Sequence, residues 1–213
     1  MNEKEIIHVI IAIIILSIVI SFTELIQTNF YYLGTAIIFA SIIIITNVLG
    51  KKVAASFLDA SVEHSILSWS RYGFKPDWHL KKEIPSGAIL PLVFSAFSLG
   101  YIKVMAILTY DTSALKRRAA KRFGHYSYTE MTDFHTALVG AGGIVITLLL
   151  AFITYWTGPE TLARMAAFYA FWNMIPVSKF DGTQIYFGSR VLWTILTLIT
   201  LLFAAYAIFT GIY

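Results

Sequence analysis

The chain has 213 residues, of which 58% are hydrophobic and only 13% are charged, and its formal net charge is +4. Soluble domains usually carry about 25% charged residues, so this composition excludes an ordinary soluble enzyme or binding module. The absence of cysteine excludes disulfides and thiolate metal sites. Because the basic residues lie beside apolar segments, where they meet anionic lipid and set topology, we expect a multi-pass protein of the cell membrane that binds no nucleic acid.

Apolar runs of about 20 residues predict membrane-spanning helices. The chain therefore predicts an all-α polytopic membrane protein with about six such helices, arranged as an N-terminal hairpin (1–50) and a core (51–213) within one integrated domain. The first run lacks a basic flank and a small-residue cleavage site, so we expect a retained helix rather than a signal peptide. The six runs are Ile6–Phe22, Tyr31–Leu49, Val53–Tyr72, Thr136–Trp156, Leu162–Ile175 and Val191–Ile212.

A seventh apolar run, Ile84–Tyr110, differs from these because it contains helix breakers and a charge, among them Pro85, Pro91 and Lys103. Such residues are tolerated at membrane depth only where protein or a water-filled cavity covers the backbone. The run therefore predicts a broken re-entrant or hairpin segment. Counting basic residues on either side does not decide between a re-entrant and a crossing segment.

An acid follows directly after an apolar segment in the stretch Asn173, Pro176, Asp181, Gly182. An ionisable group at membrane depth costs about 2.5 to 3.5 kcal/mol on insertion scales and points to function. This order of residues resembles the third motif of the site-2 protease family, which are intramembrane zinc metalloproteases. The resemblance implies that the aspartate stands where the family has a zinc ligand.

Further landmarks extend the resemblance from about residue 53 to the end of the sequence. They are Arg71-Tyr72-Gly73-Phe74, Gly100 to Ala106, Gly140-Ala141-Gly142-Gly143 and Tyr186 to Trp193, and the second is typical of prokaryotic, especially archaeal, members. The resemblance implies a site-2-protease-like fold with a groove that holds an extended membrane segment. We expect Asn173, Pro176, Gly182, Gly142 and Gly143 to line that groove.

The histidine motif of the family, H-E-x-x-H, is absent from the sequence. Counting back from Gly73 places Ser61, Val62 and Ser65 at the two histidines and the glutamate. One inserted residue would instead place His64 at the second histidine, with Ala60 and Ser61 at the other two positions. Catalytic zinc needs three protein ligands, an activated water and a nearby base, so the motif is degenerate in both alignments.

Two acids and a histidine offer an alternative metal site. Asp59 and Glu63 would share one face of a helix at four-residue spacing, and with His64 and Asp181 they could hold zinc or an oxygen-preferring divalent cation. The competing interpretation is that both acids pair with Lys179 or Arg71, or stay hydrated at the interface. We expect no cofactor, with the divalent metal as the alternative.

These observations predict a pseudoprotease that binds a membrane partner or serves as an accessory subunit of a membrane complex. The expected docking region is Asn173–Asp181 together with the Gly140–Gly143 turn, where small residues permit close helix contact. The alternative is an active intramembrane metalloprotease with unconventional ligands.

Overall fold

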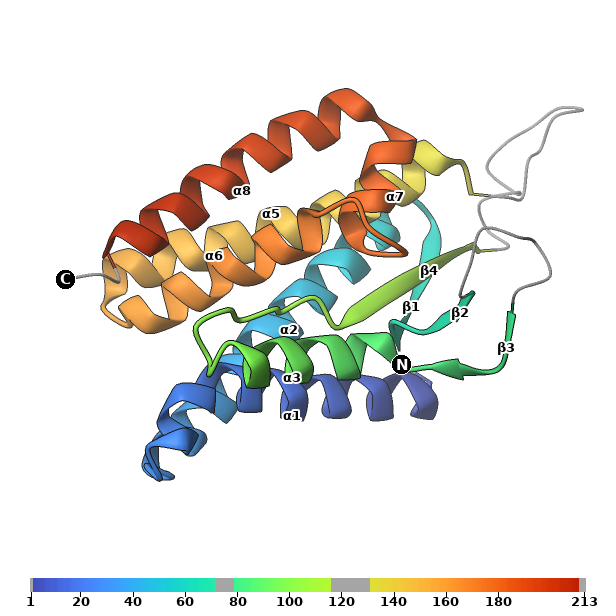
Figure 1. Cartoon of the computed structure of the whole chain (residues 1–213). Coiled ribbons are helices and arrows are strands. Elements are labelled where there is room, and N and C mark those ends of the chain that lie inside the picture. The colour runs from blue at the N-terminus through green and yellow to red at the C-terminus, as the bar shows by residue number, and fades with distance from the viewer. Residues whose placement is uncertain (1, 72–78, 116–130, 211–213) are drawn as a thin grey trace, which may run out of the picture.

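The computed structural model describes residues 2–71, 79–115 and 131–210. The protein is mostly helical and carries two small antiparallel sheets at one end (Figure 1). The helices and strands in chain order are α1 (Glu3–Ile26), α2 (Tyr31–Phe57), β1 (Ala60–Ile66), β2 (Trp69–Arg71), β3 (His79–Ile84), α3 (Ser86–Phe97), β4 (Leu108–Ala114), α5 (Asp133–Thr157), α6 (Glu160–Met174), α7 (Asp181–Gly188) and α8 (Arg190–Thr210).

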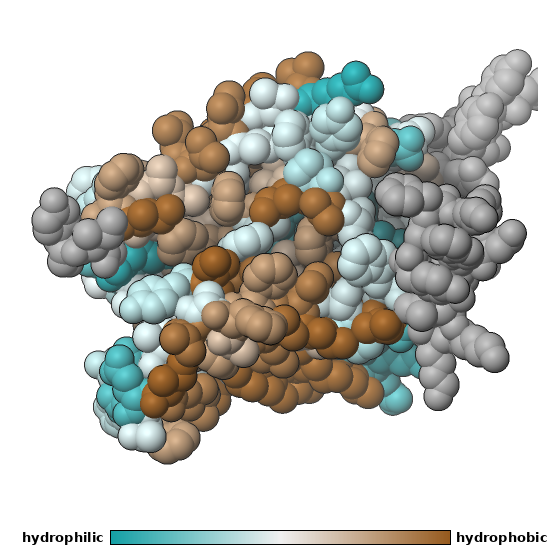
Figure 2. Space-filling model, in the orientation of Figure 1, coloured by the Kyte–Doolittle hydropathy of each residue, from teal (hydrophilic) through white to brown (hydrophobic). Residues whose placement is uncertain are grey.

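Four helices, α1, α2, α5 and α8, are long and apolar enough to cross a membrane, which confirms the prediction of a membrane protein. Hydrophobic side chains cover the face of α1 that is visible in Figure 2. Helix α6 has 15 residues and is shorter than these four. It packs against α5 and α8 (Figure 1), and alanines such as Ala166 and Ala170 are fully buried on it.

The predicted span Val53–Tyr72 is wrong, because helix α2 continues through Lys51 and Lys52 to Phe57 and the chain then turns. Asp59 adopts a left-handed conformation (φ 51°), which aspartate tolerates better than most residues and which ends the helix. Strand β1 follows, with Ala60, Val62 and His64 buried on one side and Glu63 exposed on the other. The expectation of an all-α fold therefore missed both sheets. Tyr72 and Gly73 lie outside the described residues.

The prediction that the run Ile84–Tyr110 does not form a single helix is confirmed. Helix α3 has 12 residues and ends at Phe97, and the chain reverses through Leu99 (φ 53°) and Gly100 (φ 86°). It then returns in extended form to β4, which lies at the same end of the molecule as the start of α3 (Figure 1). The segment is thus a helix-and-strand hairpin, with Pro91 accommodated inside α3.

Strand β4 connects this hairpin to β1 in an antiparallel pair. His64 lies opposite Tyr110, and Ile66 lies opposite Leu108. Strands β2 and β3 form the second pair, with Trp69 opposite Ile84. The β1–β4 pair places Tyr110 beside α5 and α7, where the candidate site lies.

Glycines bring α5 into close contact with α2. A Cβ atom at Gly142 would lie 2.6 Å from the Cβ of Ala54, and one at Gly143 would lie 2.7 Å from Cγ of Lys51. The close helix approach that the sequence predicts for these small residues is therefore made within the chain. Gly143 is buried beneath α2, and Gly142, which also packs against α2, is half-buried.

Candidate functional site

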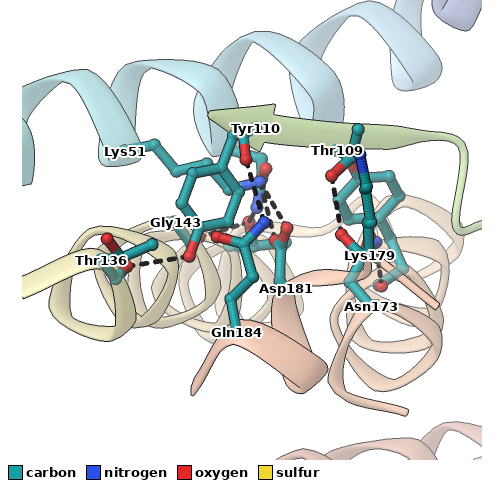
Figure 3. Close-up of polar contacts among 12 residues, drawn as sticks. Lys51, Thr109, Tyr110, Thr136, Gly143, Asn173, Lys179, Asp181 and Gln184 are labelled. Atoms are coloured by element: carbon teal, nitrogen blue, oxygen red, sulfur yellow. Dashed lines mark hydrogen bonds and ion pairs between the residues drawn. The ribbon is translucent and has the colours of Figure 1, made fainter. Parts of the chain in front are cut away.

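A buried ion pair joins Lys51 near the end of α2 to Asp181 at the start of α7 (Figure 3). The Nζ atom of Lys51 lies 2.8 Å from Oδ1 and 2.7 Å from Oδ2 of Asp181, and it donates a hydrogen bond to Oδ1. The side chains are 1% and 0% exposed. Such a pair is stable only when both charges are present, because removing one partner leaves an uncompensated buried charge.

The turn before α7 directs Asp181 towards α2. Ser178 adopts a left-handed conformation (φ 55°) in this turn, and Phe180 is buried beneath it. Gly182 packs against the end of α6, where a Cβ atom would lie only 2.1 Å from the carbonyl oxygen of Met174. Any side chain at this position would push α7 away from the end of α6 and displace its aspartate. The glycine of the Asp-Gly pair is therefore needed for the close approach of α7 and α6.

Tyr110 completes the surroundings of the ion pair. Its ring centroid lies 4.7 Å from Nζ of Lys51, a cation–π arrangement, and its hydroxyl donates to the carbonyl oxygen of Thr136 at 2.9 Å. Burial raises the pKa of Asp181, and the Lys51 charge opposes that shift. Burial and the Asp181 charge raise the pKa of Tyr110 well above its usual value, so the phenol stays neutral.

Asn47 lies one helical turn before Lys51, and both side chains meet α5 at Gly143. The Asn47 amide donates to Oγ1 of Thr147 at 3.2 Å, and this hydroxyl donates to the carbonyl of Gly143 at 2.8 Å. The Oδ1 atom of Asn47 is buried without a hydrogen-bond partner among the described residues. The site therefore contains a hydrogen-bond acceptor, Oδ1 of Asn47, that is free to bind a donor next to the ion pair.

The predicted groove residues differ in exposure. Asn173 is 1% exposed and donates from Nδ2 to the carbonyl of Tyr169 at 2.8 Å, while Pro176 lies in an exposed loop. Two hydrogen bonds tie this region to β4: Thr109 Oγ1 donates to the carbonyl of Lys179 at 2.6 Å, and Gln184 Nε2 donates to the carbonyl of Tyr110 at 2.9 Å (Figure 3).

The predicted metal ligands are not brought together. His64 Nδ1 lies 2.9 Å from Oε1 of Glu5 on α1, Glu63 is exposed on the other face of β1, and Asp59 belongs to the turn that ends α2. The helical face that Asp59 and Glu63 were expected to share does not exist. Across residues 2–71, 79–115 and 131–210, no three His, Cys, Asp or Glu side chains converge as metal ligands would.

His64 has instead become part of an ionic cluster between α1, α2 and β1. Glu5 is 4% exposed and also contacts Nζ of Lys52 at 2.8 Å. Burial and the Lys51 charge lower the pKa of His64 to about 4, although Glu5 raises it. The imidazole is therefore neutral at physiological pH and donates its Nδ1 proton to Glu5.

The residues around Asp181 do not fit a catalytic zinc ion. Zinc takes neutral imidazole, thiolate or carboxylate ligands, and here Asp181 is accompanied by an amide and a cationic ammonium group. The ammonium group of Lys51 occupies the position beside the Asp181 carboxylate that a bound metal ion would take. The arrangement can hold the helices and the hairpin together.

Comparisons with known protein families, with curated proteins and with solved structures find no match to this chain.

Proposed function

We propose that this chain is a catalytically degenerate membrane protein of site-2-protease-like fold that acts by binding a membrane protein partner. The observation that carries the proposal is the buried Lys51–Asp181 ion pair. In this pair a lysine of the chain itself neutralises the aspartate of the Asn-Pro-Asp-Gly motif.

The spacing on α2 supports the resemblance. The two histidines of H-E-x-x-H stand four residues apart on one helical face, and Asn47 and Lys51 have that spacing and lie on the face of α2 that meets α5. On this alignment Val48 takes the place of the glutamate base. The degenerate motif would then be Asn47 to Lys51 rather than the segment 60–65 favoured by counting back from Gly73.

The basic residues support one membrane orientation. The start of α1, the end of α2 and the start of α8 lie on the side of the molecule that carries the sheets (Figure 1), and these segments carry Lys4, Lys51, Lys52 and Arg190. Lys103 and Arg164 lie towards the opposite end. The positive-inside rule places the sheet end in the cytoplasm of a multi-pass cell-membrane protein with about six membrane segments, counting α6 and the hairpin of α3.

The partner surface comprises the exposed loop Pro176–Lys179 and the adjoining edge of β4. Leu67 N donates to Ile107 O and Leu115 N donates to Asp59 O, each at 3.0 Å. In an antiparallel pair every second residue forms hydrogen bonds with the partner strand, so these two bonds show which residues of β4 face β1 with their backbone groups. The backbone groups of Leu108, Tyr110 and Thr112 consequently point away from β1. Thr112 is half-buried, whereas Leu108 and Tyr110 are 1% and 0% exposed. An extended partner segment can therefore add first beside Thr112, and it can reach Tyr110 only once Gln184 releases the Tyr110 carbonyl.

A photo-crosslinking residue at Val177, which is 53% exposed, tests the proposal in native membranes. We expect one defined polypeptide adduct there, and none from the matched position Val145 on α5, which is 41% exposed. Equal, heterogeneous adducts at both positions would count against a specific partner. The active-protease alternative predicts stoichiometric metal in the purified protein and cleavage of a tagged membrane substrate, and either result would overturn the pseudoenzyme assignment.

A further inference from the structure

A hollow lies at the end of the molecule where α5 turns into α6, away from the ion pair. It has a volume of about 670 Å³ and lies between α5, α6 and α8. The hollow forms because the three helices have small alanine side chains at its base and larger side chains along its rim. The floor consists of Ala151, Ala163, Ala167 and Ala207, all buried, and Phe152 and Trp156 are among the exposed walls.

The helices and aromatic residues around the hollow indicate where it lies relative to the membrane. Two of its three helices, α5 and α8, are long and apolar enough to cross a membrane, so a groove between them would face the hydrocarbon of the bilayer. Tyr155, Trp156 and Tyr206 stand at this end, as in the aromatic belts that mark the membrane interface. The hydroxyls of Tyr155 and Tyr206 are hydrogen-bonded to each other and join α5 to α8.

One cation lines the hollow and is poorly neutralised within the chain. Nη2 of Arg164 lies 3.8 Å from Oε2 of Glu160, at the limit of an ion pair. Its Nε atom is buried and has no hydrogen-bond partner among the described residues. Lys103 also lies near enough to interact with Arg164, although Glu24 offsets part of the Lys103 charge. Basic groups beside pockets between membrane helices bind phospholipid headgroups.

We propose that this groove, the α5–α6–α8 groove, binds a single phospholipid, with an acyl chain over the alanine floor and the phosphate at Arg164. A pocket of this size accommodates a ligand of several hundred daltons. An acyl chain that fills it gains close van der Waals contact with the alanine and aromatic surface, which loosely packed annular lipid does not make. The proposal is independent of the partner-binding function. It assigns a lipid site to a part of the fold that the ion pair does not use.

Native mass spectrometry of the purified full chain, titrated with dipalmitoylphosphatidylglycerol, tests the site. We expect one lipid to bind before any others. Ala207→Phe fills the floor and should abolish this first binding event, whereas Ala205→Phe, on the same helix but outside the groove, should retain it. Arg164→Gln should weaken binding about fivefold and should not change binding of uncharged dipalmitoylglycerol.

Circular dichroism and gel filtration establish that each variant is folded. If Ala207→Phe does not fold, the comparison of Arg164→Gln against wild type with the charged and uncharged lipids decides the proposal alone. Equal lipid binding by wild type and all folded variants would show annular lipid only and would overturn it. A protein adduct from a photo-crosslinking residue at Phe209 in native membranes would show that a helix fills the groove instead.

Discussion

The Nζ atom of Lys51 lies 2.7 Å from Oδ2 of Asp181, although 130 residues separate them in the chain. This contact joins α2 to α7 across the packed face of α5 and lies beneath the ring of Tyr110. It links the N-terminal helices to the Asn-Pro-Asp-Gly segment.

Removing one member of this pair should be more damaging than removing both. Lys51→Met alone and Asp181→Asn alone should each lower the free energy of unfolding by about 3 to 5 kcal/mol, because each leaves one buried charge without its partner. The double variant Lys51→Met/Asp181→Asn should recover much of that loss, because no unpaired charge stays buried. Thermal or chemical unfolding in detergent measures the cycle. Additive losses in the double variant would show that the two charges are not coupled.

The sequence identified Asp181 because an acid after an apolar segment is conspicuous, but it did not identify Lys51. A lysine pair ordinarily marks the end of a membrane helix, so the sequence predicts a boundary between two spans at Lys51 and Lys52. The structure shows why α2 continues: Lys51 is neutralised by Asp181 and Lys52 by Glu5. Neither partner is close in sequence, so no local pattern could have predicted these contacts.

Strand β1 could have been predicted. Apolar or buried residues alternate with polar ones at Ala60, Val62, His64 and Ile66, which is the period of a half-buried strand. The family resemblance favoured a helix at this place and outweighed the pattern. The Glu5–His64 contact had no sequence signal, since 59 residues separate the two side chains.

The pKa of His64 makes stability depend on pH. Its folded value of about 4 lies below the ordinary value of 6.5, so between these values the unfolded chain binds a proton that the folded chain does not. The free energy of unfolding should therefore fall as the pH decreases from 6.5 to 4, by up to about 3 kcal/mol from this group. Thermal unfolding across this range should show a smaller decrease for His64→Gln. His135→Gln, at the start of α5, is the control, and identical pH profiles for wild type and His64→Gln would contradict the assignment.

The contact between α2 and α5 should be sensitive to one methyl group. Gly142→Ala places a Cβ 2.6 Å from that of Ala54, so the helices must separate, and we expect a loss of about 1 to 3 kcal/mol. Gly34→Ala, on the same helix as Ala54, meets nothing within 4 Å and should stabilise the protein by about 0.5 to 1 kcal/mol through helix propensity. Melting temperatures in one detergent compare the two. A loss of equal size in both variants would mean that glycine is not needed for close packing at 142.

Membrane orientation can be measured by single-cysteine labelling, since the chain has no cysteine of its own. Glu83→Cys before α3 and Asp111→Cys in β4 flank the hairpin and should react from the same, cytoplasmic side. Thr28→Cys and Thr157→Cys, at the opposite helix ends, should react from the other side. An impermeant maleimide added to intact cells and to inverted vesicles separates these outcomes. Labelling of Glu83→Cys and Asp111→Cys from opposite sides would disprove the hairpin.

Two substitutions on α2 should convert the ion-pair site into a zinc site if Asn47 and Lys51 occupy the histidine positions. Asn47→His with Lys51→His replaces an amide and a cation by two imidazoles one turn apart, which together with Asp181 supply the three protein ligands of a catalytic zinc ion. We expect stoichiometric zinc in the double variant, measured by atomic absorption and by competition with a chelating dye. Addition of Asp181→Asn should weaken that binding.

The matched control is Asn47→His with Lys52→His, because Lys52 contacts Glu5 on α1 rather than Asp181. This variant also gains two histidines, but it keeps the Lys51 charge against Asp181, so we expect no stoichiometric zinc. Equal zinc uptake by the two double variants would mean that the added histidines bind metal without Asp181. A folded Asn47→His/Lys51→His protein that binds no zinc would remove the spacing argument for the site-2-protease-like fold, since the ligands would then not converge on Asp181.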